Sequence, residues 1–262
     1  MALSHARGFS RQVFLESPWY AWLEPMLSRV TQGEEFPAPE VWTQLHAELA
    51  PRAGVPALTF ASAPAKKPRR RTRTSPVVLG ELYEGRIVER GQVPTRLDDW
   101  HDFFNALAFL AFPAAKWALH ARQYRLLQAR IAPHARRLPG ARTREQDALS
   151  LLDEGGILVA LPSAHAAALP DDPEAFERAL APWFEARVAR AVPFGHALFE
   201  HLVLGRDDML GTLVVVPVTC ETDCRSELRT VLDRALAELL CDPTLFQEPS
   251  RARGLPLARL TP

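Results

Sequence analysis

A strongly apolar helix, predicted over residues 100–112 ("WHDFFNALAFLAF"), most constrains what this chain can fold into. Asp98 or Asp99 is placed to cap it, because an aspartate side chain accepts hydrogen bonds from the first free amides of a helix. Pro113 then fits the first turn of a second helix, which we expect to run to about residue 131. A chain of 262 residues buries roughly 70–75% of the surface its unfolded form exposes. It therefore needs no disulfide or metal to stay folded.

The rest of the chain predicts helices and strands that do not alternate regularly. Helices are expected within 11–50 and over 174–189, 195–204 and 226–240, and strands over 58–61 and 212–218. We expect an irregular strand pair at 77–89 and a β-hairpin at 148–161 with its turn at Asp153-Glu154-Gly155-Gly156. This pattern predicts an α+β fold with a small, mainly antiparallel sheet packed against several helices.

A basic, proline-rich segment at 62–76 ("SAPAKKPRRRTRTSP") interrupts the pattern. It holds six basic residues and three prolines and nothing to bury, so we interpret it as a disordered linker or loop. The expected organisation is a helical N-terminal segment (1–61), this linker, and a main α+β domain (77–262) that packs with 1–61 as one globule. A nucleic-acid interface at 66–73 is the alternative, but no aromatic side chain lies between the charges to stack on bases.

Charge and cysteine content argue against several classes of partner. Acidic and basic residues balance at 31 each, so without the basic loop the rest of the chain carries a net charge of −6. The longest apolar stretch, 106–115, is interrupted by Pro113 and is far shorter than the ~20 residues that cross a bilayer. An odd number of cysteines and an N-terminus without an apolar signal region favour a reducing compartment. We therefore expect a cytoplasmic protein with no membrane partner.

The first candidate site lies on the predicted helix at 100–112. His101 and Asn105 share one helical face, and Asp98 lies three residues before His101. Asp102 follows His101 directly and therefore lies on the adjacent part of the helix surface. One interpretation is a metal ligand or general base at His101, with an adjacent acid that fixes its tautomer. In the other, an aspartate caps the helix, Asp102 interacts with the helix dipole and His101 is a structural histidine.

The second candidate site is "FGHALFEHL" at 194–202. His196 and Glu200 are four residues apart, which suits two metal ligands or a base and the acid that orients it. Gly195 leaves room for another backbone to come close, and His201 is expected to point elsewhere. A histidine on an amphipathic helix is more often structural than catalytic, and the HExxH zinc signature is absent.

Carboxylates and cysteines supply the remaining candidates. Asp147 precedes the predicted hairpin and is the better candidate for a site, because Asp153 and Glu154 most simply form the turn. The Cys220–Cys224 spacing matches no zinc or redox motif. No phosphate-binding glycine loop and no GxSxG elbow occur, so nothing indicates a nucleotide-dependent enzyme or an α/β-hydrolase.

Three blocks in order, from "YEGRIVERGQVPTRLDDWHDFFNALAFLAFPAAKWAL" through "DALSLLDEGGILVA" to "FGHALFEHL", resemble a bacterial family of proteins of unknown function. The family brings no established activity. The resemblance implies that ten positions fall on its motifs, namely Arg96, Trp100, His101, Asp102, Asn105, Asp147, Asp153, Glu154, His196 and Glu200. The basic loop is a departure from the family pattern.

These residues favour a metal-dependent hydrolase acting on a small molecule or a phosphoester. A divalent metal would be held by His101, Asp102, His196 and Glu200. Catalysis would involve His101, Asp102, Asn105, Asp147 and Arg96, and Trp100, Asp153 and Glu154 would bind substrate.

Two other functions stay open: a non-catalytic binding or scaffold protein with a buried polar network, and a nucleic-acid-associated protein or nuclease. Known hydrolase templates fit less well. A phosphohydrolase of the HD type would need His46 as its upstream ligand, across the linker. The pattern of Asn105, Leu107, Lys116 and His120 also resembles the helix of HNH-type nucleases, but 77–96 holds no histidine to complete the site.

Overall fold

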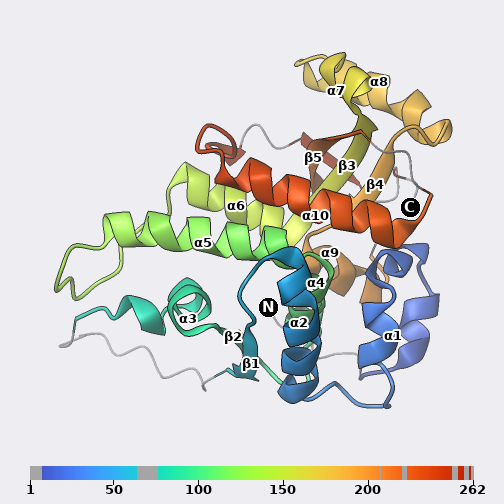
Figure 1. Ribbon diagram of the computed structural model, residues 1–262. Coiled ribbons are helices and arrows are strands. Elements are labelled where there is room, and N and C mark those ends of the chain that lie inside the picture. The colour runs from blue at the N-terminus through green and yellow to red at the C-terminus, as the bar shows by residue number, and fades with distance from the viewer. Residues whose placement is uncertain are drawn as a thin grey trace.

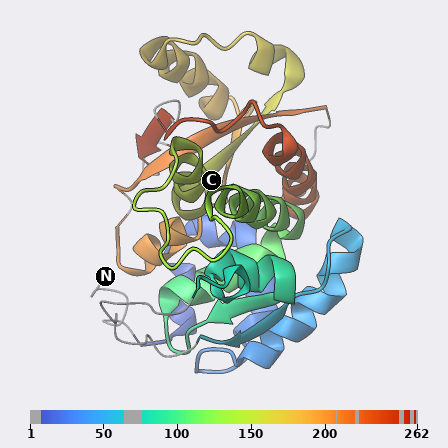
Figure 2. The same ribbon diagram turned by 90° about the vertical axis from the view of Figure 1, so that its left-hand side faces the viewer.

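A computed structural model describes residues 8–63, 76–206, 208–219, 223–249, 253–256 and 260. The basic segment at 66–73 and Cys220 lie outside the described residues. In both views (Figures 1 and 2), helices α7 (Ser163–Ala167) and α8 (Pro173–Glu185) lie at one end, beyond the main sheet. The small sheet formed by β1 (Thr59–Ser62) and β2 (Gln92–Thr95) lies at the other end.

The main sheet has four described strands in the order β4 (Arg190–Pro193), β3 (Gly156–Pro162), β5 (Leu210–Val218) and β6 (Arg253–Pro256). The central pair, β3 and β5, is parallel, and each edge strand is antiparallel to its neighbour. The fold is therefore α+β as expected, but the prediction of a mainly antiparallel sheet is wrong. The elements α7, α8, β4 and α9 (His196–Val203) separate β3 from β5 in the chain, and a connection of that length allows parallel pairing.

The apolar helix and the helix that follows it form where the sequence predicts them. Helix α4 spans Trp100–Ala111, and the Asp99 carboxylate caps it by accepting a hydrogen bond from the Asp102 amide at 3.1 Å. Helix α5 (Pro113–Arg130) begins with Pro113 in its first turn. Its next amides, at Ala114 and Ala115, donate to Asp233 of helix α10 (Arg225–Cys241), which lies beside α5 (Figure 1).

The remaining predicted elements agree less evenly with the structure. The strands expected at 58–61 and 212–218 are confirmed as β1 and β5, and the helices expected at 174–189, 195–204 and 226–240 as α8, α9 and α10. The N-terminal helical region divides into two 3₁₀ turns (Arg11–Leu15 and Pro18–Leu23), α1 (Met26–Val30) and α2 (Pro39–Ala53). No helix among the described residues is long and apolar enough to cross a membrane.

Two predicted strand pairs are wrong, because helix replaces both strands of the first and one strand of the second. The segment at 77–89 forms a 3₁₀ turn (Leu79–Glu81) and helix α3 (Tyr83–Arg90). A side chain at Gly85 would collide with the backbone of Leu79 and Gly80, so this glycine marks close packing of the 3₁₀ turn on α3. The predicted hairpin at 148–161 is helix α6 (Arg144–Gly155) followed directly by β3. A capping box between Thr143 and Gln146 starts α6, and Asp153 and Glu154 belong to its last turn.

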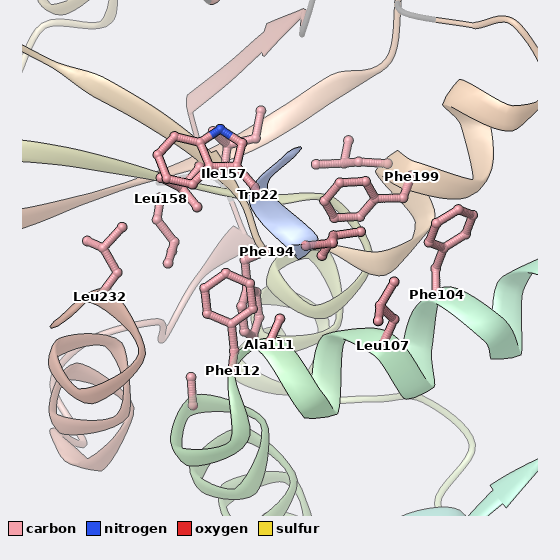
Figure 3. Close-up of a cluster of buried hydrophobic side chains, with 14 of the residues drawn as sticks. Trp22, Phe104, Leu107, Ala111, Phe112, Ile157, Leu158, Phe194, Phe199 and Leu232 are labelled. Carbon is pink, nitrogen blue, oxygen red and sulfur yellow. The ribbon is translucent and has the colours of Figure 1, made fainter. Parts of the chain in front are cut away.

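One buried cluster joins distant parts of the chain (Figure 3). Trp22 from the N-terminal region packs there with Phe112, which follows α4, with Ile157 of β3 and with Leu232 of α10. Residues on both sides of the basic segment therefore contribute to the same core. Within this core, α6 packs on the main sheet, α9 packs on α6 and α4 packs on α9, and those helices carry the candidate site.

Candidate metal centre

Two imidazole rings from helices far apart in the sequence meet at the start of α4 and α9. The Nε2 atoms of His101 and His196 are 3.1 Å apart, and the rings lie nearly perpendicular with centroids 4.5 Å apart. The His101 side chain is 29% exposed, whereas His196 is 3% exposed. The structure thus brings together the two histidines that the sequence placed on separate helices.

Close packing at Gly195 positions His196. The amides of Phe194 and Gly195 both donate to the Gly156 carbonyl at 2.9 Å, which holds the start of α9 against the junction of α6 and β3. A Cβ atom at Gly195 would lie 2.5 Å from the Glu154 carbonyl oxygen and would also collide with the Gly156 amide. The expected close backbone approach at Gly195 is confirmed, and it places His196 beside Asp153 and Glu154.

Replacing Gly195 with alanine is therefore expected to lower the free energy of unfolding by about 1–3 kcal/mol, the usual range for forced overpacking. Urea unfolding of the variant measures this loss. Gly140→Ala is the matched control, because nothing lies within 4 Å of a Cβ built at that position. An unchanged stability in Gly195→Ala would contradict the packing described here.

Glu154 completes a group of three potential metal ligands. Its Oε2 atom is 3.4 Å from the Nε2 atom of His196, and one ligand atom from each of His101, His196 and Glu154 lies within 4.8 Å of the others. The Glu154 side chain is half exposed, so the group is open to solvent on this side. Two imidazoles and a carboxylate at such spacing are a ligand set used by divalent metals.

A carboxylate lies behind each imidazole. The Oε2 atom of Glu200 is 2.9 Å from Nδ1 of His101, and Oδ1 of Asp153 is 3.9 Å from Nδ1 of His196. Burial alone would lower the pKa of His101, but the hydrogen bond to Glu200 and the surrounding carboxylates raise it above its usual value. The pKa of His196 lies well below its usual value, because burial disfavours the charged ring.

A buried lysine organises the side chains behind the histidines. Lys116 of α5 is fully buried, and its Nζ atom donates to Asp153 at 2.5 Å and to Asn105 at 2.9 Å. Asn105 in turn donates to the Tyr83 hydroxyl at 2.8 Å. Burial would raise the pKa of Asp153, but the charges of Lys116 and the nearby histidines hold it well below its usual range. Asp153 is therefore a carboxylate, fixed in place beside His196.

Residues 73–260 match the model of a protein family described as "Protein of unknown function (DUF3025)". This match covers well over half of the chain. The chain belongs to this family. The predicted resemblance to a family of unknown function is thereby confirmed, and the DUF3025 region includes every residue of the group around His101 and His196. No match is found among curated proteins or among solved structures.

In this DUF3025 chain, Asp102 and Arg96 lie apart from the three-ligand group. The Asp102 carboxylate accepts hydrogen bonds from Arg96 through its backbone amide (2.6 Å), Nε (3.0 Å) and Nη2 (2.7 Å). Arg96 also pairs with Asp99 at 2.9 Å. Asp102, predicted as a metal ligand, instead ties the segment before α4 to the first turn of that helix.

Three other predicted residues have different surroundings from those expected. Trp100, predicted to bind substrate, is 1% exposed and packs among aromatic rings, stacking on Phe104 with centroids 5.8 Å apart. Asn105 is buried between Lys116 and Tyr83. Asp147 is exposed in the first turn of α6 and does not contact the histidines, although it lines a neighbouring hollow.

That hollow lies next to Glu154 and has a volume of about 520 Å³. Asp153 and Glu154, in the last turn of α6, line both the hollow and the space around His196. Its other lining residues are mostly polar, namely Tyr83, Glu84, His120, Gln123, Arg142, Asp147, Ser150, Leu151 and Pro249. His101 and His196 do not line this hollow, so Glu154 is the member of the three-ligand group that links the group to a space large enough for a small molecule.

Sequence reasoning overlooked Lys116 as a site residue, although the sequence contained a signal. The chain has 31 basic residues but only three lysines, two of them in the basic segment at 66–73. Lys116 is the third and stands in an otherwise apolar stretch. Its ammonium group is fully buried and donates to the Asn105 side-chain oxygen and to the Asp153 carboxylate.

Proposed function

We propose that this protein is a metal-dependent hydrolase whose divalent metal is held by His101, His196 and Glu154. The observation that carries the proposal is the 3.1 Å separation of the two Nε2 atoms, with the Glu154 carboxylate 3.4 Å from one of them. Metal–ligand bonds of about 2.0–2.2 Å place neighbouring ligand atoms at about this separation. Glu200 behind His101 supplies the outer carboxylate that metal-bound histidines usually have.

A hydrogen bond between the two rings is the competing explanation of the separation. Such a bond needs a proton on one of the two facing Nε2 atoms. If His196 donated it, the lone pair on its Nδ1 would face the Asp153 carboxylate 3.9 Å away, which is unfavourable. His101 can donate it as a cation, because its Nδ1 then keeps the proton that faces the Glu200 carboxylate 2.9 Å away. A divalent metal instead lets both rings stay neutral, with protons on Nδ1 and both Nε2 lone pairs directed at the metal, and metal reconstitution distinguishes the two arrangements.

The chemistry follows from this arrangement. A divalent metal supplies Lewis-acid catalysis there, because it polarises a bound carbonyl or phosphoryl oxygen and lowers the pKa of water. Glu200 orients His101 through a hydrogen bond, and Lys116 holds the Asp153 carboxylate near Nδ1 of His196. Arg96 and Asp102 fix the start of α4 and thereby the position of His101.

Metal reconstitution of the full chain tests the proposal. A ligand set of two histidines and one carboxylate suits zinc, and it also suits iron(II), so zinc, manganese and iron(II) are compared. We expect about one bound metal per chain for at least one of them, by elemental analysis after gel filtration. Binding far below one equivalent for all three metals would overturn the proposal.

Replacing Glu200 with glutamine is expected to weaken metal binding by about 10- to 100-fold, the usual effect of losing an outer-shell partner. The amide keeps the size of the carboxylate but removes the charge that orients His101. Competition with a chromophoric chelator measures the affinity. Glu174→Gln on α8, where the side chain is 86% exposed, is the control and should leave it unchanged. An unaltered affinity in Glu200→Gln would show that this carboxylate does not support a metal ligand.

A non-catalytic scaffold protein is the second candidate, favoured by the connected hydrogen bonds of Tyr83, Asn105, Lys116 and Asp153. Such a network contributes to a specific fold when each member is satisfied. This candidate predicts that the histidines matter for stability in the absence of any metal. The hydrolase proposal predicts that the histidines matter chiefly for binding the metal.

A further inference from the structure

We propose that the hollow beside Glu154 binds the substrate, and that His120 at its wall recognises an uncharged carboxamide group. Hydrolysis of the bound amide rests on the proposed hydrolase function, whereas binding of the amide does not. It names a substrate class, small neutral or cationic amides, in place of phosphoesters. The hollow, the state of His120 and the charges of the lining carry it.

His120 is buried yet lacks a hydrogen-bond partner within the described part of the chain. The residue is 2% exposed and lines the hollow, and neither of its ring nitrogens has a partner there. Its ring stacks on Phe109 (centroids 5.3 Å apart, 10° between planes) and meets the edge of Tyr83. A buried polar group without a partner is costly, so an imidazole fixed at the wall of a hollow indicates a ligand that satisfies it.

The charge state of His120 determines which ligand groups fit. Burial first, and the nearby Lys116 charge second, lower the pKa of His120 to about 3. The ring is therefore neutral at physiological pH and offers one N–H donor and one lone pair. A carboxamide can pair with either ring nitrogen, because its carbonyl accepts from the N–H and its NH₂ donates to the lone pair, whereas a phosphate dianion offers acceptors alone.

The rest of the lining disfavours anions. Among the described residues that line the hollow, four are carboxylates (Glu84, Asp147, Asp153 and Glu154) and one is an arginine (Arg142). Burial raises the pKa of Glu84, and the Asp153 charge acts in the same direction. A neutral or cationic amide is compatible with this lining, and a phosphate dianion is repelled by it.

The reaction of such a ligand is hydrolysis of its C–N bond. The oxygen of a water molecule bonds to the carbonyl carbon, the C–N bond breaks, and the leaving nitrogen takes a proton from that water. The products are a carboxylic acid and an amine. No oxidant, reductant or second substrate is needed.

The test uses the full chain labelled with ¹⁵N at its histidine rings and backbone, prepared with and without zinc. Acetamide and inorganic phosphate are titrated separately by NMR. We expect acetamide to shift the His120 ring nitrogens and the backbone amides of Gln123 and Ser150 in a saturable way, and phosphate to leave them unchanged. Stronger shifts of these groups with phosphate, or no saturable shift with acetamide, would overturn the inference.

Variants at position 120 separate recognition from packing. His120→Phe keeps an aromatic ring against Phe109 and should weaken acetamide binding by about five- to tenfold, the contribution of about one neutral hydrogen bond. His120→Gln keeps a donor and an acceptor and should retain most of the affinity. His165→Phe, which replaces a histidine that packs against Trp183, is the control. Equal affinity in wild type and His120→Phe would assign His120 a packing role only.

The two proposals fail in different ways. If the chain binds zinc and His120→Phe does not alter acetamide binding, the hydrolase proposal stands and the present inference falls. If the chain binds no metal, the hydrolase proposal falls, and the metal-free titration still decides whether His120 recognises the amide.

Discussion

Replacing Lys116 with methionine is expected to lower the free energy of unfolding by about 3–5 kcal/mol, the usual cost of breaking a buried ion pair. Methionine fills the space of the lysine stem, so the loss comes from charge and hydrogen bonding rather than from a cavity. The variant leaves the Asp153 carboxylate, 13% exposed, without its ammonium partner 2.5 Å away, and Asn105 without its donor. Urea unfolding of the metal-free protein measures the difference.

Two further variants show whether the buried pair is the cause. Arg178→Met removes an exposed ion pair between Arg178 (side chain 70% exposed) and Glu174 (86% exposed). It should change the free energy of unfolding by less than about 1 kcal/mol. The double variant Lys116→Met/Asp153→Leu replaces both charges by apolar groups and should recover much of the loss. A stability loss below 1 kcal/mol in Lys116→Met would mean that the lysine does not organise the site.

Replacing His196 with alanine is expected to weaken metal binding by about 100- to 1000-fold. The variant loses one of three protein ligands, and the total binding free energy of a structural metal site is roughly 10–16 kcal/mol. The same variant discriminates the two candidate functions. In a hydrolase, metal stabilises the wild type in proportion to its concentration and affinity, and this gain disappears in the variant. In a scaffold protein, the free energy of unfolding of the variant is lower by roughly several kcal/mol even without metal, because buried polar groups lose their partner.

Thermal unfolding with and without zinc separates these outcomes. The control is His201→Ala, five residues further along α9, where the histidine lies outside the three-ligand group. A melting temperature that rises with zinc equally in wild type and in His196→Ala would exclude His196 as a ligand. A zinc response in the wild type that is absent only from His196→Ala would support the hydrolase.

Local sequence patterns were sufficient to predict the structure of a segment when the interactions that determine it lie within that segment. The capping aspartate before Trp100 and the proline at 113 define the ends of α4 and the start of α5, and both were predicted. The i,i+4 relation of His196 and Glu200 likewise follows from helix geometry alone, and both side chains reach His101. In these cases backbone hydrogen bonding within one helix dictates the outcome.

Local patterns failed where two structures satisfy the same short sequence. Two apolar runs around Asp153-Glu154-Gly155-Gly156 are typical of a hairpin, but they also fit a helix that ends at glycine and continues as a strand. The capping box at Thr143 and the packing of Gly156 against Phe194 decide for the helix. Glu154 thereby changes from a predicted turn residue to a potential metal ligand on the last turn of α6.

The sequence by itself therefore determined the apolar helices, their caps and the pairing of polar residues along each helix, because these depend on neighbours within a few positions. Only the tertiary structure decided which carboxylates join the two histidines. Gly195 lets the start of α9 approach the end of α6, and Lys116 holds Asp153 behind His196. Those contacts join residues tens of positions apart, and packing of α4, α5, α6 and α9 around one core brings them together.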